Sequence, residues 1–252
     1  MNTLASGDAW VAGNQSGESN IAECFEALWS VSGRLVNEPN SRRHGTSETI
    51  RLALKKAQYG LQPGNYFIKR QQAYYYRAFS TLGTRHPTCS REFDALRQFK
   101  SLGLDVPEVA YFHHERDSKR AILITRELVG YRDLKSELAQ PPSTHWRTEL
   151  VRCLSQAFRG LHSTRYRHGA LYPDHVFVAG DSVAFIDLEK ARVTLSRRAN
   201  ALTDISRFLR YARGLLPQEI AIILVPYERE FPGFISLVRW HMSRKIHRPQ
   251  PP

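Results

Sequence analysis

Cysteine is scarce in this sequence, and no two cysteines lie close together. The 252 residues include three, Cys24, Cys89 and Cys153, and these form no C-x-x-C pair. A sparse, odd set argues against a disulfide framework and against a zinc ribbon, and it is typical of a reducing compartment. We therefore expect plain thiols that are partly buried.

Long apolar runs are also absent. No stretch approaches the roughly 20 apolar residues that a membrane-spanning helix needs. The longest run, Ile220 to Val225, is closed by Pro226 and is typical of a core segment. Residues 1–22 lack the basic and apolar regions of a signal peptide, so we expect a flexible tail and a cytoplasmic protein. A second flexible tip is expected at 247–252.

Acidic residues are too few to balance the basic ones. Lys and Arg total 36 against 24 Asp and Glu, which gives a net charge of +12. This excess favours polyanionic partners such as nucleotides, anionic lipid head groups, phosphorylated glycans or nucleic acid. Because the basic residues are dispersed rather than gathered in one run, nucleic acid is the least favoured of these.

The first half of the chain has the pattern of a mostly β lobe. Residues 42–54 and 61–71 predict two strands of a hairpin, with Tyr66 and Ile68 on one face and Lys69 on the other. A helix is expected next over 88–103, capped by Ser90. Two further strands follow, at 106–112 and 120–128.

From Gly130 the pattern changes to that of a mostly α lobe. A polar connection at 131–144 leads to an amphipathic helix at 145–163, then to a loop and two short strands, and residues 196–246 are mostly helical in pattern. The order of elements predicts an α+β, protein-kinase-like two-lobed fold. It has a mostly β N-lobe with one helix at 23–129 and a mostly α C-lobe at 130–246.

Two residues of the first lobe match parts that phosphoryl transfer requires, namely a held and neutralised phosphate. Lys69 on the second strand can reach the phosphates of a nucleotide, although an isolated strand lysine is most often solvated. Glu92, in the first turn of the following helix, can pair with Lys69. A glutamate near a helix N-terminus is also favoured by the helix dipole alone.

The segment HGALYPDH, residues 168–175, has the rhythm of the protein-kinase catalytic loop H-R-D-L-x-x-x-N. Ala170 stands in place of the aspartate that accepts the substrate proton, and His175 in place of the asparagine that holds a metal. His175 is either a metal ligand through its neutral imidazole or a satisfied core residue. Asp204 either hydrogen-bonds this loop or caps its own helix.

Asp187 ends the apolar strand VAFID, where kinases place a metal-binding aspartate. An aspartate there is costly unless it points into a site, so the pattern favours a functional role. The neighbours depart from the kinase triplet D-F-G, because this sequence has Asp187-Leu188-Glu189.

Six stretches together resemble one family, and these are NEPNSRRHGTSETIRL, YFIKRQ, SREFDALRQFKSLGLDVPEVAYF, ILITREL-GY-DL, HGALYPDHVFV and FIDLEKAR. They are similar to the lipopolysaccharide kinase (Kdo/WaaP) family, most closely to its InaA-type branch. The resemblance implies ATP and Mg²⁺ as cofactors and a sugar hydroxyl of the lipopolysaccharide core, or another acidic glycolipid, as acceptor. By position, it implies nucleotide binding by Lys69, Glu92, Gly45, Ser47, Glu127 and Leu128, metal binding by Asp187 and His175, and catalytic roles for Asp187, His168 and Asp174.

Two hypotheses stay open. A placed general base contributes about 10²–10⁴-fold, so Ala170 predicts a slow kinase. Asp174, the nearest carboxylate in sequence, and Glu189 are the candidates to replace the missing base. The alternative is a pseudokinase with a regulatory or envelope-stress role, which Ala170 and the single glycine at Gly45 favour. Peripheral contact with the inner membrane is a further expectation for the basic surface. Residues 237–248 could take part in it, but the pattern favours a helix that packs Leu237 and Trp240 onto the C-lobe.

Overall fold

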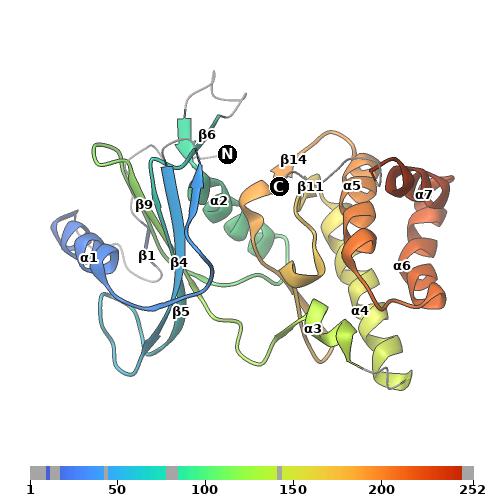
Figure 1. Ribbon diagram of the computed structural model, residues 1–252, viewed down its shortest axis with the longest axis horizontal. Helices are drawn as coiled ribbons and strands as arrows, with labels where there is room; N and C mark the ends of the chain where they lie inside the picture. The colour runs from blue at the N-terminus through green and yellow to red at the C-terminus, as the bar shows by residue number, and fades with distance from the viewer. Residues whose placement is uncertain (1–9, 12–17, 43–44, 78–84, 141–143, 246–252) are drawn as a thin grey trace. The chain divides into compact units, whose positions relative to one another are not determined.

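The computed structural model describes residues 10–11, 18–42, 45–77, 85–140 and 144–245 (Figure 1). The chain divides into two compact units: unit 1 is Met1–Gln98 with Pro107–Val129, and unit 2 is Phe99–Val106 with Gly130–Pro252. Within the described residues the strands pair in antiparallel sheets, beside seven α-helices. The prediction of a mixed α and β protein is therefore confirmed.

Unit 1 is built on a seven-stranded sheet, in which neighbouring strands run antiparallel. Its main path has the order β1-β8-β9-β5-β4-β2, and β3 also pairs with β4. These strands are β1 (Trp10–Val11), β2 (Arg34–Leu35), β3 (Asn40–Arg42), β4 (Gly45–Leu54), β5 (Gly64–Gln72), β8 (Val109–Glu115) and β9 (Arg120–Arg126). A separate short hairpin joins β6 (Tyr75–Arg77) and β7 (Arg85–Pro87).

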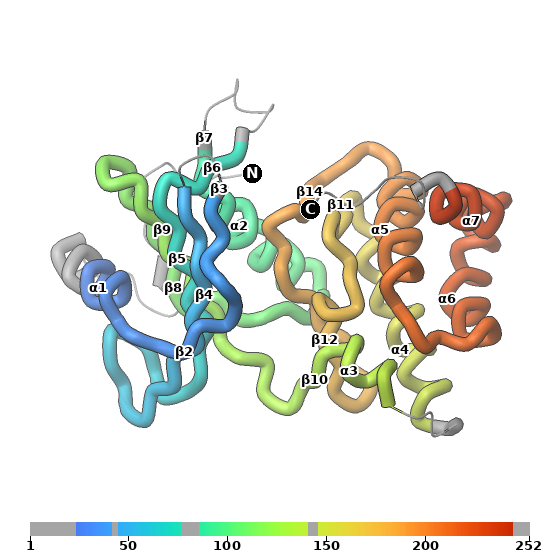
Figure 2. Tube along the Cα trace, viewed as in Figure 1, coloured from blue at the N-terminus to red at the C-terminus, as the bar shows by residue number. Residues whose placement is uncertain are grey.

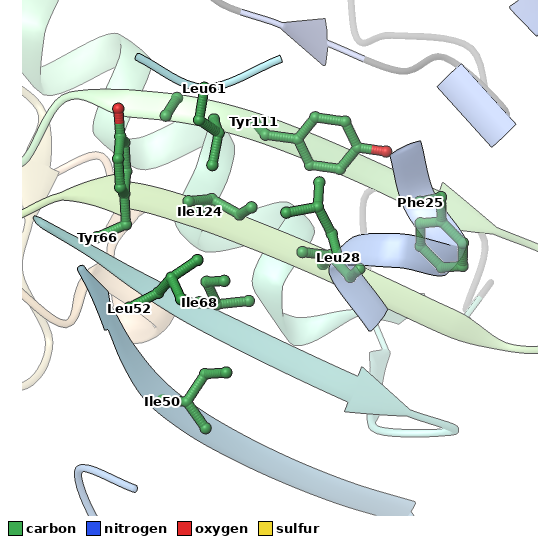
Figure 3. Packing of buried hydrophobic residues seen from close by; sticks show 11 residues of the cluster. Phe25, Leu28, Ile50, Leu52, Leu61, Tyr66, Ile68, Tyr111 and Ile124 are labelled. Carbon is green, nitrogen blue, oxygen red and sulfur yellow. The ribbon is translucent and has the colours of Figure 1, made fainter. Parts of the chain in front are cut away.

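Successive side chains of β5 point to opposite faces of the sheet, and a helix packs on each face. Tyr66 and Ile68 are fully buried on one face, in a cluster that also contains Phe25 and Leu28 of helix α1, Glu18–Ser30 (Figure 3). The opposite face of β5 is covered by helix α2, Thr88–Ser101, and Figure 1 shows the two helices on opposite sides of the sheet. The predicted two faces of β5 are therefore confirmed.

The structure differs from expectation at both helices of unit 1. Helix α1 begins at Glu18, and β1 pairs with β8, so parts of the expected tail at 1–22 are ordered elements. The rest of that range lies outside the described residues, as does the expected tip at 247–252. Helix α2 begins at Thr88 rather than after Ser90, which puts Glu92 in its second turn.

Unit 2 joins two small sheets to a group of helices. Its strands are β10 (Arg132–Asp133), β11 (Tyr166–Arg167), β12 (Val176–Ala179), β13 (Ser182–Phe185) and β14 (Arg192–Val193). Its helices are α3 (Leu134–Ala139), α4 (Thr144–Ser163), α5 (Arg197–Tyr211), α6 (Pro217–Glu230) and α7 (Phe234–Lys245). The chain path shows α4 to α7 lying together, with α4 packed on α6 and α5 on α7 (Figure 2).

Two local expectations in unit 2 were wrong, and the expected packing of Leu237 and Trp240 is observed only in part, since Leu237 is partly buried. The connection at 131–144 contains helix α3, because the side chain of Asp133 accepts a hydrogen bond from Ser136 N at 2.9 Å and caps it. Pro226 does not close a segment, since α6 continues through it to Glu230. Helix α7 packs through Phe234 and Val238, whereas Trp240 is half exposed.

Within the described ranges, no helix combines the length and the apolar character that crossing a membrane would require.

Candidate functional site

Lys69 and Glu92 form an ion pair on the α2 face of β5. Lys69 Nζ lies 2.5 Å from Glu92 Oε2, and the two side chains are only 19% and 10% exposed. Because removing either charge from water is costly, each partner compensates for the burial of the other. The structure therefore brings together the two residues that the sequence proposed as a pair, and it holds the ammonium in one place.

Gln71 explains why α2 starts where it does. Its side-chain Oε1 accepts hydrogen bonds from Cys89 N and Thr88 Oγ1, both at 2.9 Å. A helix N-terminus leaves backbone N–H groups without partners, and this amide from the neighbouring strand satisfies one of them. Sequence reasoning missed Gln71, since a capping partner 18 residues away leaves no local signal.

Gly45 and Ser47 lie at the start of β4, in the sheet of unit 1. Gly45 is buried, and a Cβ added there would lie 2.4 Å from the carbonyl oxygen of Ala73, so only glycine fits. Ser47 Oγ accepts a hydrogen bond from Gln71 Nε2 at 3.2 Å. Close packing therefore gives Gly45 a structural reason to be glycine, and the role of both residues toward phosphate stays a prediction.

Glu127 follows β9 and is tied to β4 by its carboxylate. Arg51 donates to it through Nε at 2.9 Å and through Nη2 at 2.8 Å. These hydrogen bonds hold the pKa of Glu127 below its usual value. Its backbone N–H donates to the carbonyl of Asn65 on β5 at 2.9 Å, which fixes the chain before Leu128. Contact of Glu127 and Leu128 with a nucleotide base stays a prediction.

In unit 2, Asp204 of α5 holds the start of the segment 168–175. Its carboxylate accepts the backbone N–H of His168 at 2.8 Å and of Gly169 at 3.0 Å. Ser196, not Asp204, caps α5. Burial alone would raise the pKa of Asp204, but His162 and the bonded N–H groups hold it below its usual value. The sequence left two roles open for Asp204, and the structure shows the hydrogen bonds to the loop rather than the helix cap.

His168 is a buried structural residue of this loop. It is fully buried, and that burial lowers the pKa of its imidazole to about 4. Ala170 N donates to its Nδ1 at 3.3 Å, so the proton of the neutral ring is on Nε2. A neutral, enclosed ring is suited to supporting the loop rather than to exchanging protons with a substrate.

His175 and Asp187 approach each other at the end of the same loop. His175 Nδ1 lies 2.9 Å from the carbonyl oxygen of Ala170, and a carbonyl can only accept, so Nδ1 carries the proton. The neutral ring then has its lone pair on Nε2. Asp187 Oδ2 lies 3.5 Å from Nδ1. Asp187 adopts a left-handed conformation with φ 55°, which is uncommon for a residue other than glycine but is tolerated by aspartate better than by most residues.

Asp187 fits a magnesium ion better than His175 does. No group of three or more His, Cys, Asp or Glu side chains suitable for a metal lies in the described part of the chain. Mg²⁺ does not need such a set, because it keeps several waters and takes one or two carboxylates plus substrate phosphates. Imidazole favours other metals. The partly exposed carboxylate of Asp187 could supply such a ligand, and the roles of Asp187 and His175 toward a metal stay predictions.

Comparison with known proteins identifies the family. Residues 26–227 match the model of the lipopolysaccharide kinase (Kdo/WaaP) family. The chain belongs to this family. It is also similar to Protein InaA of Escherichia coli (strain K12), with 27% identity over 198 residues that cover 74% of this chain and 87% of that protein. The resemblance inferred from the sequence is confirmed, and membership suggests a kinase.

The loop of this lipopolysaccharide kinase family member has a second anchor that the sequence did not reveal. Arg207 Nη1 donates to the carbonyl oxygen of Gly169, and its guanidinium lies 5.6 Å from the ring centroid of Tyr172. Asp204 and Arg207 are three residues apart on α5, so they share one face of the helix. Asp204 accepts hydrogen bonds from backbone N–H groups of the loop, and Arg207 donates a hydrogen bond to one of its carbonyl oxygens. The spacing D-x-x-R was the available signal.

The loop has no carboxylate at the position of Ala170. Ala170 is 1% exposed, so its methyl group is enclosed by the loop. Asp174 is exposed on the short turn Pro173–His175, and its Oδ2 lies 3.9 Å from Lys135 Nζ. Glu189 lies in the turn Leu188–Lys190 and is partly buried. Catalytic roles for Asp174 and His168 stay predictions.

Proposed function

We propose that this protein is an ATP-dependent kinase that transfers a phosphoryl group to a sugar hydroxyl of the lipopolysaccharide core or of another acidic glycolipid. It would have a protein-kinase-like two-lobed fold, with an N-lobe at 23–129 and a C-lobe at 130–246. It would act on the cytoplasmic face of the inner membrane, in peripheral contact with the lipid. The observation that carries the proposal is the enclosed ion pair between Lys69 and Glu92.

The ion pair supports nucleotide binding because a stable core has little need of it. Replacing a buried ion pair by apolar residues is often neutral or stabilising, so such a pair is weak evidence for a purely structural role. An ammonium fixed on a strand by a helix carboxylate is suited to neutralising nucleotide phosphates. Family membership supports the same role.

In the proposal Asp187 would hold Mg²⁺ through its carboxylate. The bound ion would neutralise charge on the phosphate oxygens during transfer. His175 would orient the segment beside Asp187, since its Nδ1–H is already donated to the loop carbonyl of Ala170. Asp204 and Arg207 would keep that loop in place.

Ala170 makes a slow enzyme the expected outcome. The loose transition state of phosphoryl transfer puts little charge on the attacking oxygen, so positioning and electrostatics supply most of the acceleration. A missing base removes about 10²–10⁴-fold rather than all activity. The second candidate function is a pseudokinase with a regulatory or envelope-stress role, favoured by the methyl group of Ala170 in place of a carboxylate.

Nucleotide binding is tested first, by thermal unfolding with ATP, with and without Mg²⁺. A ligand at ten times its Kd stabilises the folded state by about 1.4 kcal/mol. For a chain of this size that raises Tm by roughly 3–6 °C. Lys69→Ala and Asp187→Ala should abolish the rise. The matched controls Lys55→Ala and Asp181→Ala alter exposed residues and should keep it.

The outcomes separate the two functions. A magnesium-dependent rise that both site variants lose, followed by transfer of labelled phosphate to core glycolipid, would support the kinase. The same rise without any transfer would support the pseudokinase. No rise at any ATP concentration would exclude the nucleotide site and with it the kinase.

A further inference from the structure

Leu195 is the most exposed of the large apolar residues that the structure describes. It is 97% exposed, and Val193, two residues earlier, is 48% exposed. Both lie in the segment Arg192–Ser196, which begins with β14 and ends at Ser196, the N-cap of α5. Single exposed apolar residues are common on protein surfaces, so the inference depends on the rigid backbone and the charged residues around these two side chains.

The backbone around Leu195 is fixed, so the side chain is held outward. Thr194 N donates to Arg165 O at 2.9 Å, and Thr194 Oγ1 donates to Asn200 Oδ1 at 2.7 Å. Asn200 Nδ2 in turn donates to Arg165 O at 3.1 Å. These bonds join the segment to the start of β11 and to the first turn of α5. Leu195 therefore projects from the end of the two-stranded β11–β14 ribbon.

Three arginines lie on the ribbon close in sequence to this apolar tip, and two of them share the face opposite to Val193. Arg192 of β14 lies directly opposite Arg167 of β11, and like charges in such cross-strand positions repel. Arg167 Nε is buried and has no hydrogen-bond partner within the described residues. Arg165 and Arg192 are exposed. A nearby anion would relieve the repulsion between Arg167 and Arg192.

We propose that the end of the β11–β14 ribbon, with Leu195 at its tip, Val193 on one face and Arg165, Arg167 and Arg192 nearby, docks on an anionic lipid bilayer. We call this end of the ribbon the Leu195 surface. The small apolar tip would enter the interface while the arginines meet the lipid phosphates, each cation adding to the attraction. Nucleic acid would use the cations and aromatic stacking but not an aliphatic tip. A stable protein interface needs about 800 Å² per partner, far more than one leucine and one valine supply.

This inference deepens the proposed function, on which it rests for the identity of the acceptor. The strand β11 runs directly into His168, and β14 follows Asp187 by five residues (192 − 187). The lipid-docking ribbon is thus continuous in sequence with both segments of the candidate site in unit 2. A lipid-linked sugar would be presented to the same unit that carries the loop.

Lipid binding is tested by co-sedimentation with vesicles of phosphatidylcholine, with and without phosphatidylglycerol, in the absence of nucleotide. The full chain should bind only the anionic vesicles, and less at high salt. Leu195→Ser should weaken this binding about tenfold, the effect of one aliphatic side chain leaving an apolar medium. The control Val129→Ser changes another residue that is 82% exposed and should bind like wild type.

Further variants distinguish the other occupants. Binding that survives Leu195→Ser but is lost in Trp240→Ser would assign docking to α7 and overturn the proposal. A change of oligomeric state in Leu195→Ser without any change in vesicle binding would assign the surface to a second copy. Absence of binding to anionic vesicles would also overturn it. The ATP-dependent rise in Tm should persist in Leu195→Ser, so failure of docking and failure of the nucleotide site are separate results.

Discussion

At the residue scale, Glu92 is expected to matter for nucleotide binding through Lys69. Glu92→Gln keeps the shape of the side chain but removes the charge that holds the ammonium 2.5 Å away. A hydrogen bond to a charged group contributes about 1.5–3 kcal/mol, so the affinity for ATP should fall at least about tenfold. The measurement is the ATP-dependent rise in Tm.

The matched control for Glu92 lies on the same helix. Asp94→Asn removes an equal charge from an exposed position of α2, two residues further on. ATP binding should be unchanged in this variant. Equal losses in Glu92→Gln and Asp94→Asn would show a general effect of the charge of α2 and would contradict a specific role for the pair.

The lowered pKa of His168 predicts how the free energy of unfolding depends on pH. This pKa is about 4 in the folded protein, because of burial, against an ordinary value of 6.5. Between these values the unfolded chain binds a proton that the folded protein does not, so the free energy of unfolding falls as pH falls. Protonation linked to this residue alone lowers the free energy of unfolding by about 2 kcal/mol between pH 7 and pH 5. Urea unfolding at pH 7 and pH 5 measures it.

The variant His168→Asn isolates this contribution. Asparagine does not titrate, so the difference in stability between wild type and variant should narrow as pH falls from 7 to 5. His113 and His114, whose pKa values are also lowered by burial, are present in both proteins and cancel in the comparison. Parallel pH curves for the two proteins would show that His168 is not the source.

At the scale of elements, α5 acts as the support of the loop that begins at His168. Asp204→Asn should destabilise the protein by about 2–4 kcal/mol, because two N–H groups and His162 lose a charged acceptor in a buried place. The backbone N–H groups of His168 and Gly169 should exchange faster with solvent. Asp181→Asn, an exposed change at the β12–β13 turn, is the control and should show neither effect. Equal destabilisation by both variants would argue against a support role for α5.

Local pattern explains which elements the sequence could predict. The strand β5 and the helix α4 carry their apolar residues at regular spacing, and Leu150, Leu154, Phe158 and Leu161 are indeed buried along one stripe. Helix α3 was missed because it is six residues long and depends on the cap from Asp133 and on tertiary burial of Leu134 and Leu138. Short helices gain little from propensity alone.

The candidate site was predictable where its residues belong to strong local elements or to the kinase-like motifs at 168–175 and 187. Lys69 and Glu92 could be placed from the phase of a strand and a helix. Arg207 contacts Gly169 across 38 residues of sequence, and Arg51 contacts Glu127 across 76. Such contacts depend on how elements pack, so no periodicity within one segment encodes them.

At the scale of the whole molecule, the boundary between the two units cuts helix α2 after Gln98. Phe93, before the boundary, is 1% exposed and stacks on Phe112 of β8 at 4.3 Å between ring centroids. Phe99, after the boundary, is fully buried and meets the ring of Tyr166 at 5.6 Å. One helix therefore supplies a core aromatic residue to each unit.

This division predicts two different patterns of local unfolding from two equal substitutions. Phe93→Ala and Phe99→Ala should each cost about 3–5 kcal/mol, since each removes a buried ring. Hydrogen exchange followed by mass spectrometry should show faster exchange in β8 and β9 for Phe93→Ala, and in β11 and α4 for Phe99→Ala. Each variant serves as the control for the other. If both accelerate exchange in the same peptides, the chain unfolds as one cooperative body and the two units are not independent in stability.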